Sequence, residues 1–281
     1  MGKNILKKKV IAVIYGNCVA QALAGILRKR IEFDRMFDIT YIRSFKHPTE
    51  GCTAIPLDKI KKCSLFFFQR GHLQYPEFYE KLPKNCRIIS FPILQFKRLW
   101  PFDRVDPRNK PEPEKGFLFG KYPRGDSLVM KLLRKGLTAD QVFKKYMSTN
   151  IHELKNIDQI HEQETQGGRE LDTKCDLPIY RYIEKNFIKE RLFWLPLHPA
   201  PELLVMQTNH LLTSVGMNEL DENVKSKICK SPPLSNLHLP IHPQVIDYFN
   251  LEWADKDTKY RYYDKGWFSF EEYLRRYIEF K

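Results

Sequence analysis

The residues best suited to chemistry in this sequence are Gly16, Asn17 and Cys18, which follow a short apolar run near the N-terminus. The run Val10–Tyr15 predicts a buried strand, and the apolar stripe between Val19 and Arg30 predicts a helix. Cys18 is therefore expected at a helix N-terminus, where the helix dipole and unpaired backbone N–H groups favour a thiolate and lower the pKa. The same N–H groups can hold a phosphate or an oxyanion. The plainer alternative is a small residue packed beneath the turn.

Two histidines are candidates for a general base beside this turn. His198 follows the apolar run Leu192–Leu197, and the prolines at 199 and 201 open the helix behind it. This rigid frame would direct the imidazole toward a substrate hydroxyl. His72, in the segment from Gln69 to His72, is the competing base. The alternative for each histidine is a cap of a helix or a hydrogen-bonding group of the core.

The order of elements predicts how these side chains come together. Apolar segments at 10–15, 38–43, 65–68 and 87–91 alternate with helical stretches, which is typical of βαβ units and a parallel sheet. The predicted fold class is α/β, with an N-terminal parallel-sheet core of the Rossmann or flavodoxin-like kind and a largely helical C-terminal half. Loops after parallel strands meet at one edge of the sheet, where ligands bind. We expect that edge to carry Cys18, Gln69, His72 and His198.

The predicted organisation is an α/β core over residues 1–125 and a mainly helical region over 126–281 that packs on it and contributes His198, in one integrated domain. Residues 103–124 are rich in proline, glycine and charge and are predicted to form a lid-like loop. Helices are expected from 127 to 136, over 151–163 and over 268–278. A capping box, Thr138 to Gln141, opens another helix, and Gly167-Gly168 is expected to be a turn.

Composition limits the class of function. The 281 residues carry 47 Lys and Arg against 34 Asp and Glu, a net charge of +13 that suggests an anionic partner. The sequence shows no zinc-finger, RNP-like or basic-heptad motif, so nucleic-acid binding has no motif to support it. The six cysteines lack metal-ligand spacing, and we expect reduced thiols and no metal. No run approaches the ~18 apolar residues of a membrane span, and a cytoplasmic protein is expected.

The sequence resembles the WcbI-like family of polysaccharide-biosynthesis acetyltransferases. The matching segments are Val10–Leu23, Phe68-Gln69, Ile89–Pro92, Leu99–Pro101 and Leu197–Pro199 with the helix that follows. Together they span about residues 10–216. The family commonly has glutamine directly after the cysteine, where this chain has Val19.

The resemblance implies binding of coenzyme A or acetyl-CoA and transfer of an acetyl group to a sugar hydroxyl in polysaccharide or capsule biosynthesis. The catalytic residues would be Cys18 with His198 or His72, and Cys18 would either carry the acetyl group or only shape the thioester pocket. Basic side chains on the edge loops would pair with the phosphates of coenzyme A. The expected cofactor-binding residues are Gly16, Asn17, Gln69, Arg70, Lys97, Arg98, Lys121 and Arg124.

Three other functions fit the same residues. One is an esterase or thioesterase with the same nucleophile and water as acceptor. Another is a module that binds coenzyme A or a nucleotide without turnover, and the third is RNA binding through the net positive charge. The acceptor sugar, the oligomeric state and the role of residues 217–281 stay open.

Overall fold

The computed structural model describes residues 9–71 and 75–280. The chain divides into two compact units that interleave along the sequence. The first unit comprises the chain up to Leu94, Arg169–Arg181 and Pro199–Leu234, and the second comprises Gln95–Gly168, Tyr182–His198 and Ser235–Lys281. The predicted arrangement of residues 1–125 and 126–281 as one integrated domain stays a prediction.

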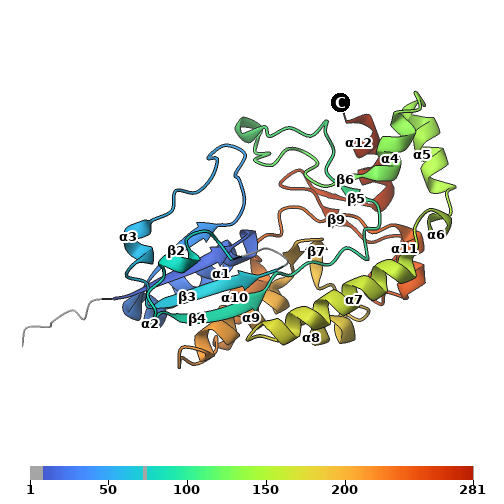
Figure 1. The fold of residues 1–281 in the computed structure, drawn as a ribbon. Coiled ribbons are helices and arrows are strands. Elements are labelled where there is room, and N and C mark those ends of the chain that lie inside the picture. Colours follow the sequence, from blue (N-terminus) through green and yellow to red (C-terminus); the bar gives the residue numbers. More distant parts are fainter. Residues whose placement is uncertain (1–8, 72–74, 281) are drawn as a thin grey trace, which may run out of the picture. The chain divides into compact units, whose positions relative to one another are not determined.

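The first unit is built on a four-stranded sheet in which every neighbouring pair is parallel (Figure 1). The strands are β1 (Val10–Gly16), β2 (Phe37–Arg43), β3 (Leu65–Arg70) and β4 (Arg87–Pro92). Their order is β2-β1-β3-β4, which matches the start of the flavodoxin-like order. The predicted α/β fold class with a parallel N-terminal sheet is therefore confirmed.

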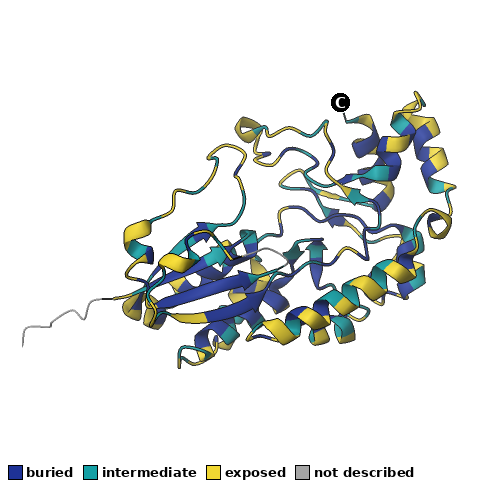
Figure 2. Ribbon diagram, in the orientation of Figure 1, coloured by how far each residue is buried: buried dark blue, intermediate teal, exposed yellow. Residues whose placement is uncertain are grey.

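Both faces of this sheet are buried, because successive side chains of each strand point to opposite sides. On one face, Ile14 and Phe67 join a core cluster with apolar residues of the helices Cys18–Lys29 and Pro201–Thr213. On the other face, Val13, Phe66 and Phe78 form a second cluster. Figure 2 shows the strands buried along most of their length. The continuous apolar runs in the sequence are explained by this two-sided burial.

Helices complete the first unit. The helix α1 packs against α9, and α9 packs against α10. The helices of this unit are α1 (Cys18–Lys29), α2 (Ile31–Met36), α3 (Leu57–Ile60), the 3-10 turn η1 (Tyr79–Lys81), α9 (Pro201–Thr213) and α10 (Glu222–Lys230). Two helices cross unit boundaries in the sequence, α7 (Ile157–Lys174) and α8 (Tyr180–Asn186).

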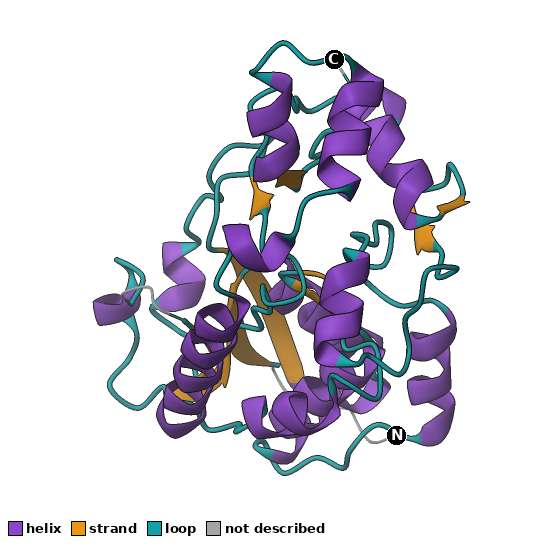
Figure 3. Cartoon of the chain, turned by 90° about the vertical axis from the view of Figure 1, so that its right-hand side faces the viewer, coloured by secondary structure: helices purple, strands orange, loops and turns teal. Residues whose placement is uncertain are grey.

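The second unit consists of helices, loops and short two-stranded ribbons (Figure 3). Its helical elements are η2 (Pro113–Lys115), α4 (Ser127–Leu133), α5 (Ala139–Met147), α6 (Ile151–Leu154), α11 (Pro243–Phe249) and α12 (Phe270–Glu279). Its strands are β5 (Asp103–Arg104), β6 (Gly125–Asp126), β7 (Phe193–Leu195), β9 (Tyr260–Arg261) and β10 (Trp267–Phe268). The short strand β8 (His198–Pro199) has one residue in each unit. The expectation of a largely helical C-terminal half is confirmed.

Some local predictions were wrong. The pair Gly167-Gly168 lies inside α7 and is not a turn. The single helix expected over residues 151–163 is two helices, α6 and α7, which Lys155 and Asn156 separate. The capping box at Thr138 is present as predicted, since its side chain accepts from the Gln141 N–H while the Gln141 side chain accepts from the Thr138 N–H.

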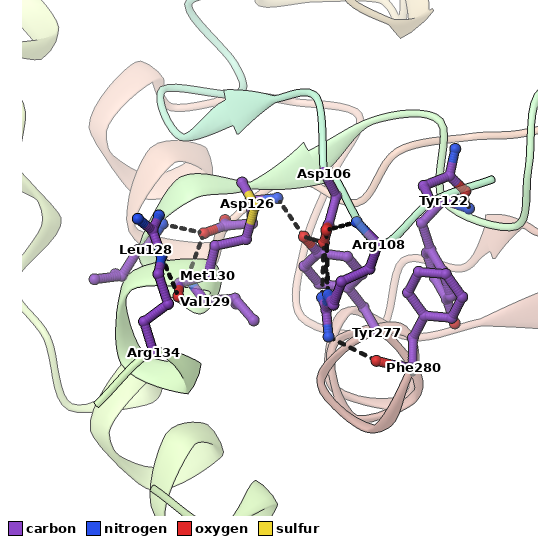
Figure 4. Close-up of polar contacts among 11 residues, drawn as sticks. Asp106, Arg108, Tyr122, Asp126, Leu128, Val129, Met130, Arg134, Tyr277 and Phe280 are labelled. Carbon is purple, nitrogen blue, oxygen red and sulfur yellow. Dashed lines mark hydrogen bonds and ion pairs between the residues drawn. The ribbon is translucent and has the colours of Figure 1, made fainter. Parts of the chain in front are cut away.

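A buried charge network stabilises the second unit (Figure 4). The Asp106 residue is 1% exposed, and its carboxylate accepts hydrogen bonds from the Arg108 guanidinium, at 2.7 Å, and from the Tyr277 hydroxyl, at 2.6 Å. The Tyr277 hydroxyl in turn accepts from the Asp126 N–H. Burial opposes ionisation of Asp106, but the hydrogen bonds from Arg108 and Tyr277 prevail and lower its pKa. This network joins residues 106, 126 and 277, which lie far apart in the sequence.

Among the helices of the described residues, none is both long and apolar enough to cross a membrane.

The Arg108→Gln variant should unfold more easily than the wild type, because it leaves the buried Asp106 carboxylate without its cationic partner. We expect a loss of ~2–3 kcal/mol in the free energy of unfolding. Urea denaturation followed by tryptophan fluorescence measures this loss, since Trp100, Trp194, Trp253 and Trp267 all belong to the second unit. The matched control is Lys259→Gln, which removes a solvent-exposed pair with Glu272 and should change little. Equal losses in both variants would contradict the prediction.

A second prediction concerns acid stability and rests on His238, which is 3% exposed and stacks on Trp194. Burial, reinforced by the nearby Arg191 and Arg261, lowers the pKa of His238 from 6.5 to about 3. In the unfolded chain His238 binds a proton near pH 6.5, whereas in the folded chain it stays neutral down to a much lower pH. The free energy of unfolding therefore decreases as the pH falls below about 6.5.

The His238→Phe variant removes this difference in proton uptake. Between about pH 6 and 4, the wild type should lose ~1.4 kcal/mol more stability per pH unit than the variant. The measurement is the free energy of unfolding against pH, with the exposed His152→Phe as control. Parallel curves for wild type and His238→Phe would refute the assignment.

Candidate active site at the carboxyl edge of the parallel sheet

The Gly16–Cys18 turn lies where predicted, between the end of β1 and the start of α1. Cys18 is the first residue of α1, and Asn17 is its N-cap, in an extended backbone conformation. The Asn17 Oδ1 atom accepts a hydrogen bond from the Val19 N–H at 2.8 Å, which satisfies one of the open donors of the first helical turn. This N–H is therefore already engaged.

Gln69, at the end of β3, holds the turn from the neighbouring strand. Its Oε1 atom accepts a hydrogen bond from the Asn17 N–H at 2.8 Å. Glycine is required at position 16 for this contact, because a Cβ atom there would lie 2.5 Å from Gln69 Oε1. Gln69 is 7% exposed, and its Nε2 atom is buried without a hydrogen-bond partner. The amide therefore has a free donor beside the turn.

Tyr41, on β2, holds the turn from the other side. Its hydroxyl lies 3.3 Å from the Gly16 carbonyl oxygen and 3.1 Å from that of Asn17, and it donates to these acceptors. Burial raises the pKa of Tyr41 to about 12, so the hydroxyl stays a donor at neutral pH. The sequence analysis did not identify this residue. The available signal was its position near the carboxyl end of the predicted second strand.

The environment of Cys18 differs from the expectation. The residue is partly exposed, but burial of its thiol raises the pKa to about 11. Hydrogen bonds from the backbone N–H groups of Cys18 and Val19 lower the pKa and offset only part of this increase. The predicted lowering of the thiol pKa was therefore wrong, because the loss of hydration outweighs the helix terminus.

A polar residue of α9 that the sequence analysis missed contacts the end of β4. Gln207 of α9 is fully buried, and its Nε2 atom donates to the Pro92 carbonyl oxygen at 3.0 Å. Its Oε1 atom has no hydrogen-bond partner. A buried polar side chain inside an apolar helical stripe was the signal that could have identified it. Gln207 thus ties α9 to the sheet edge and leaves one acceptor unsatisfied.

Among the cations predicted to bind the cofactor, Arg70 is the one that belongs to the first unit, where it is the last residue of β3. Its Nη1 atom donates to the Lys174 carbonyl oxygen at 2.7 Å, and its guanidinium lies 5.9 Å from the centre of the Tyr75 ring.

The competing base His72 lies outside the described residues. His198, the other proposed base, is the first residue of β8 in the second unit and is partly exposed.

The remaining predicted cofactor-binding cations belong to the second unit. Arg98 is 2% exposed, with its Nε atom 3.2 Å from Glu164 and an Nη atom 2.6 Å from the His161 ring. Its guanidinium also lies over the rings of Phe96 and Phe187. This arrangement is that of a core ion pair, so we infer that Arg98 has a structural role and does not bind a phosphate.

Lys97, Lys121 and Arg124 lie closer to solvent. Lys97 is exposed. The Nζ atom of Lys121 lies 3.3 Å from Glu112, and Arg124 donates from Nε to Asp103 at 2.6 Å. Since carboxylates already neutralise Lys121 and Arg124, a role for either in binding phosphate requires exchange of partners.

Comparison with known proteins places this geometry in a family. The model of the family described as polysaccharide biosynthesis enzyme WcbI matches residues 11–220. A solved structure of WcbI is 19% identical, with a TM-score of 0.66, and the match covers 97% of this chain and 90% of that one. That protein is described as a novel polysaccharide biosynthesis enzyme, in its native form without a disulfide bond between coenzyme A and one of its cysteines. At this identity the likeness shows the fold alone.

Other comparisons add nothing to the assignment. Two mutants of a periplasmic metal-binding protein from Candidatus Liberibacter asiaticus are 13% and 12% identical, over 96% of this chain and 97% of theirs. Their TM-scores of 0.23 and 0.24 are too low to support an argument. No curated protein matches the chain. The family match extends over well over half of the 281 residues and confirms the resemblance seen in the sequence, so this chain belongs to the WcbI family of polysaccharide biosynthesis enzymes.

Proposed function

We propose that this protein is an acyltransferase that takes an acetyl group from acetyl-CoA and transfers it to a sugar hydroxyl of a polysaccharide or its precursor. Membership of a family of polysaccharide biosynthesis enzymes supports the acceptor class. The description of a related structure, which mentions coenzyme A, supports the donor. The observation that carries the proposal is the Cys18 turn at the carboxyl edge of a parallel sheet, with the unpartnered Gln69 Nε2 donor beside it.

The residues of the turn fit a thioester. A buried amide N–H without a partner is costly, so a ligand oxygen that accepts from Gln69 Nε2 would be favoured there. Such a donor is suited to the carbonyl oxygen of a thioester, where negative charge develops during acyl transfer. Gly16 lets this amide lie against the turn, and Arg70 supplies positive charge for a phosphate. Lys97, Lys121 and Arg124, which retain solvent access, stay proposed as further residues that bind phosphate.

In the proposed reaction, acetyl-CoA supplies an acetyl group already activated as a thioester. Gln69 stabilises the developing oxyanion through its amide N–H. His198, or else His72, accepts the proton of the sugar hydroxyl as its oxygen bonds to the acyl carbon. The C–S bond breaks, and the departing sulfur takes up a proton to give the free thiol.

The raised pKa of Cys18 favours one of its two candidate roles. With a pKa of about 11 the sulfur is a protonated thiol at neutral pH, which is a poor nucleophile. We therefore propose that Cys18 lines the thioester pocket and lies beside the sulfur of coenzyme A. The same observation counts against a thioesterase with a cysteine nucleophile. It leaves a module that binds coenzyme A without turnover as the second candidate function.

The cellular location follows from the donor. We propose a cytoplasmic protein, because acetyl-CoA and activated sugar precursors are made there.

The proposed function predicts that acetyl-CoA consumption requires an added sugar or glycan and yields an acetylated product. Consumption without an acceptor would indicate a hydrolase, and tight binding without consumption would indicate the binding module.

The Gln69→Glu variant retains an oxygen for the Asn17 N–H but loses the amide donor, so kcat should fall ~10²-fold. Its thermal shift with coenzyme A measures whether the pocket persists. An unchanged kcat would remove Gln69 from the mechanism.

The thiol environment gives a separate prediction. At pH 7 iodoacetamide should alkylate Cys18 roughly 100-fold more slowly than a thiol of ordinary pKa, because its pKa is raised from 9.0 to about 11. Its alkylation rate should keep rising with pH to about 11, and bound coenzyme A should slow it further. Mass spectrometry of the modified peptides gives these rates, with the exposed Cys52 as internal control. Fast alkylation of Cys18 at pH 7 would restore the covalent mechanism.

A further inference from the structure

A cluster of positive charge lies on α4 of the second unit, apart from any residue used above. Lys131 lies in the last turn of the helix, and Arg134 and Lys135 lie in the turn that follows it; all three are exposed. Figure 4 shows Arg134 in this turn, where its Nε atom donates to the Met130 carbonyl oxygen. Asp126 caps the other end of the helix. The three cations therefore define one basic face at the C-terminal end of α4.

This face borders a groove of about 490 Å³. Arg104 and Lys155 add two more cations to its lining, and Leu128 and Leu154 form part of an apolar wall. Leu154 is 46% exposed, so it presents apolar surface to the groove. No Asp or Glu is found among the described residues that line the groove. The groove thus combines five cations with apolar surface.

The cations of the groove are not neutralised. In the described part of the chain, none of the five lies within ion-pair distance of a carboxylate. The negative end of the helix dipole favours cations at the end of α4, but Lys131, Arg134 and Lys135 lie within five residues of one another, and this proximity of like charges leaves a repulsion between them. A bound polyanion would relieve it. Elsewhere in the same unit the basic residues Arg98, Arg108 and Arg124 each have a carboxylate partner.

We propose that this groove binds the diphosphate group of a nucleotide-linked sugar. Lys131, Arg134 and Lys135 would bind the phosphates, and the wall at Leu154 would contact the less polar nucleoside. The volume is in the range of small-molecule sites and exceeds what inorganic phosphate needs. A concave shape suits a compact ligand better than a flat membrane surface.

This inference does not depend on the acetyl transfer proposed above. Binding in the groove should persist in Cys18→Ala, so a failure of the acetyltransferase mechanism and a failure of the groove assignment give different results.

The test is isothermal titration of the full chain with UDP, ADP, coenzyme A and inorganic pyrophosphate. UDP and ADP should bind the wild type more tightly than pyrophosphate does. The Lys131→Gln/Lys135→Gln double variant should weaken this binding ~10-fold or more, through the loss of charge-assisted hydrogen bonds. The matched control is Lys144→Gln/Lys145→Gln, which makes the same change in net charge at exposed positions of α5 and should bind as the wild type does. Arg134→Gln serves as a second groove variant if the double variant melts early.

Coenzyme A separates this groove from the site at Cys18. UDP and its sugar conjugates should lose affinity in the Lys131→Gln/Lys135→Gln variant, whereas coenzyme A, which is proposed to bind at the Cys18 turn, should bind that variant as it binds the wild type. Loss of coenzyme A binding in this variant would assign the groove to coenzyme A and overturn the proposal. Equal weakening in the α4 and α5 variants, or no nucleotide binding to the wild type, would overturn the proposal. Binding to vesicles of anionic lipid without binding to nucleotides would also overturn it, in favour of a membrane-facing surface.

Discussion

The candidate active site depends on one hydrogen bond, from the Asn17 N–H to Gln69 Oε1. It connects the turn after β1 to the end of β3, the strand beside it in the sheet. The bond is possible only because residue 16 has no side chain. Tyr41 fixes the same turn from β2 on the other side. Side chains of two neighbouring strands thus set the position of the first helical residue, Cys18, which is the kind of support that a preorganised site requires.

Two opposing effects act on the Cys18 thiol. A helix N-terminus stabilises a thiolate by a modest amount that decreases with distance and screening. Removal of the sulfur from water disfavours the thiolate, and at this position that effect is the larger one. A protonated thiol beside a free amide donor is better suited to hold and polarise a thioester than to attack it. This balance shifts the proposed chemistry from a covalent intermediate toward direct transfer.

The basic residues of the second unit fall into two groups. Arg98 and Arg108 are paired with carboxylates in or near the core, where an unpaired charge would be costly. The cations around α4 have no such partners and border an open groove. The number of basic residues therefore says less about ligand binding than their pairing does. Only the unpaired cations can bind an anion without first losing an interaction with a carboxylate.

The sequence by itself determined the fold class and the position of the Cys18 turn. The continuous apolar runs ending at Tyr15 and Phe68 reflect strands buried on both faces, and glycine and asparagine after the first run mark the turn. These signals are local, so spacing and residue type reveal them.

The tertiary structure decided what no local pattern contains. It brought Gln69 and Tyr41 to the turn, raised the pKa of Cys18 instead of lowering it, and placed Arg98 in the core. Each of these outcomes depends on neighbours that are distant in sequence. Burial and pairing, which set the energy of a charge or a thiol, are known only when the chain is folded.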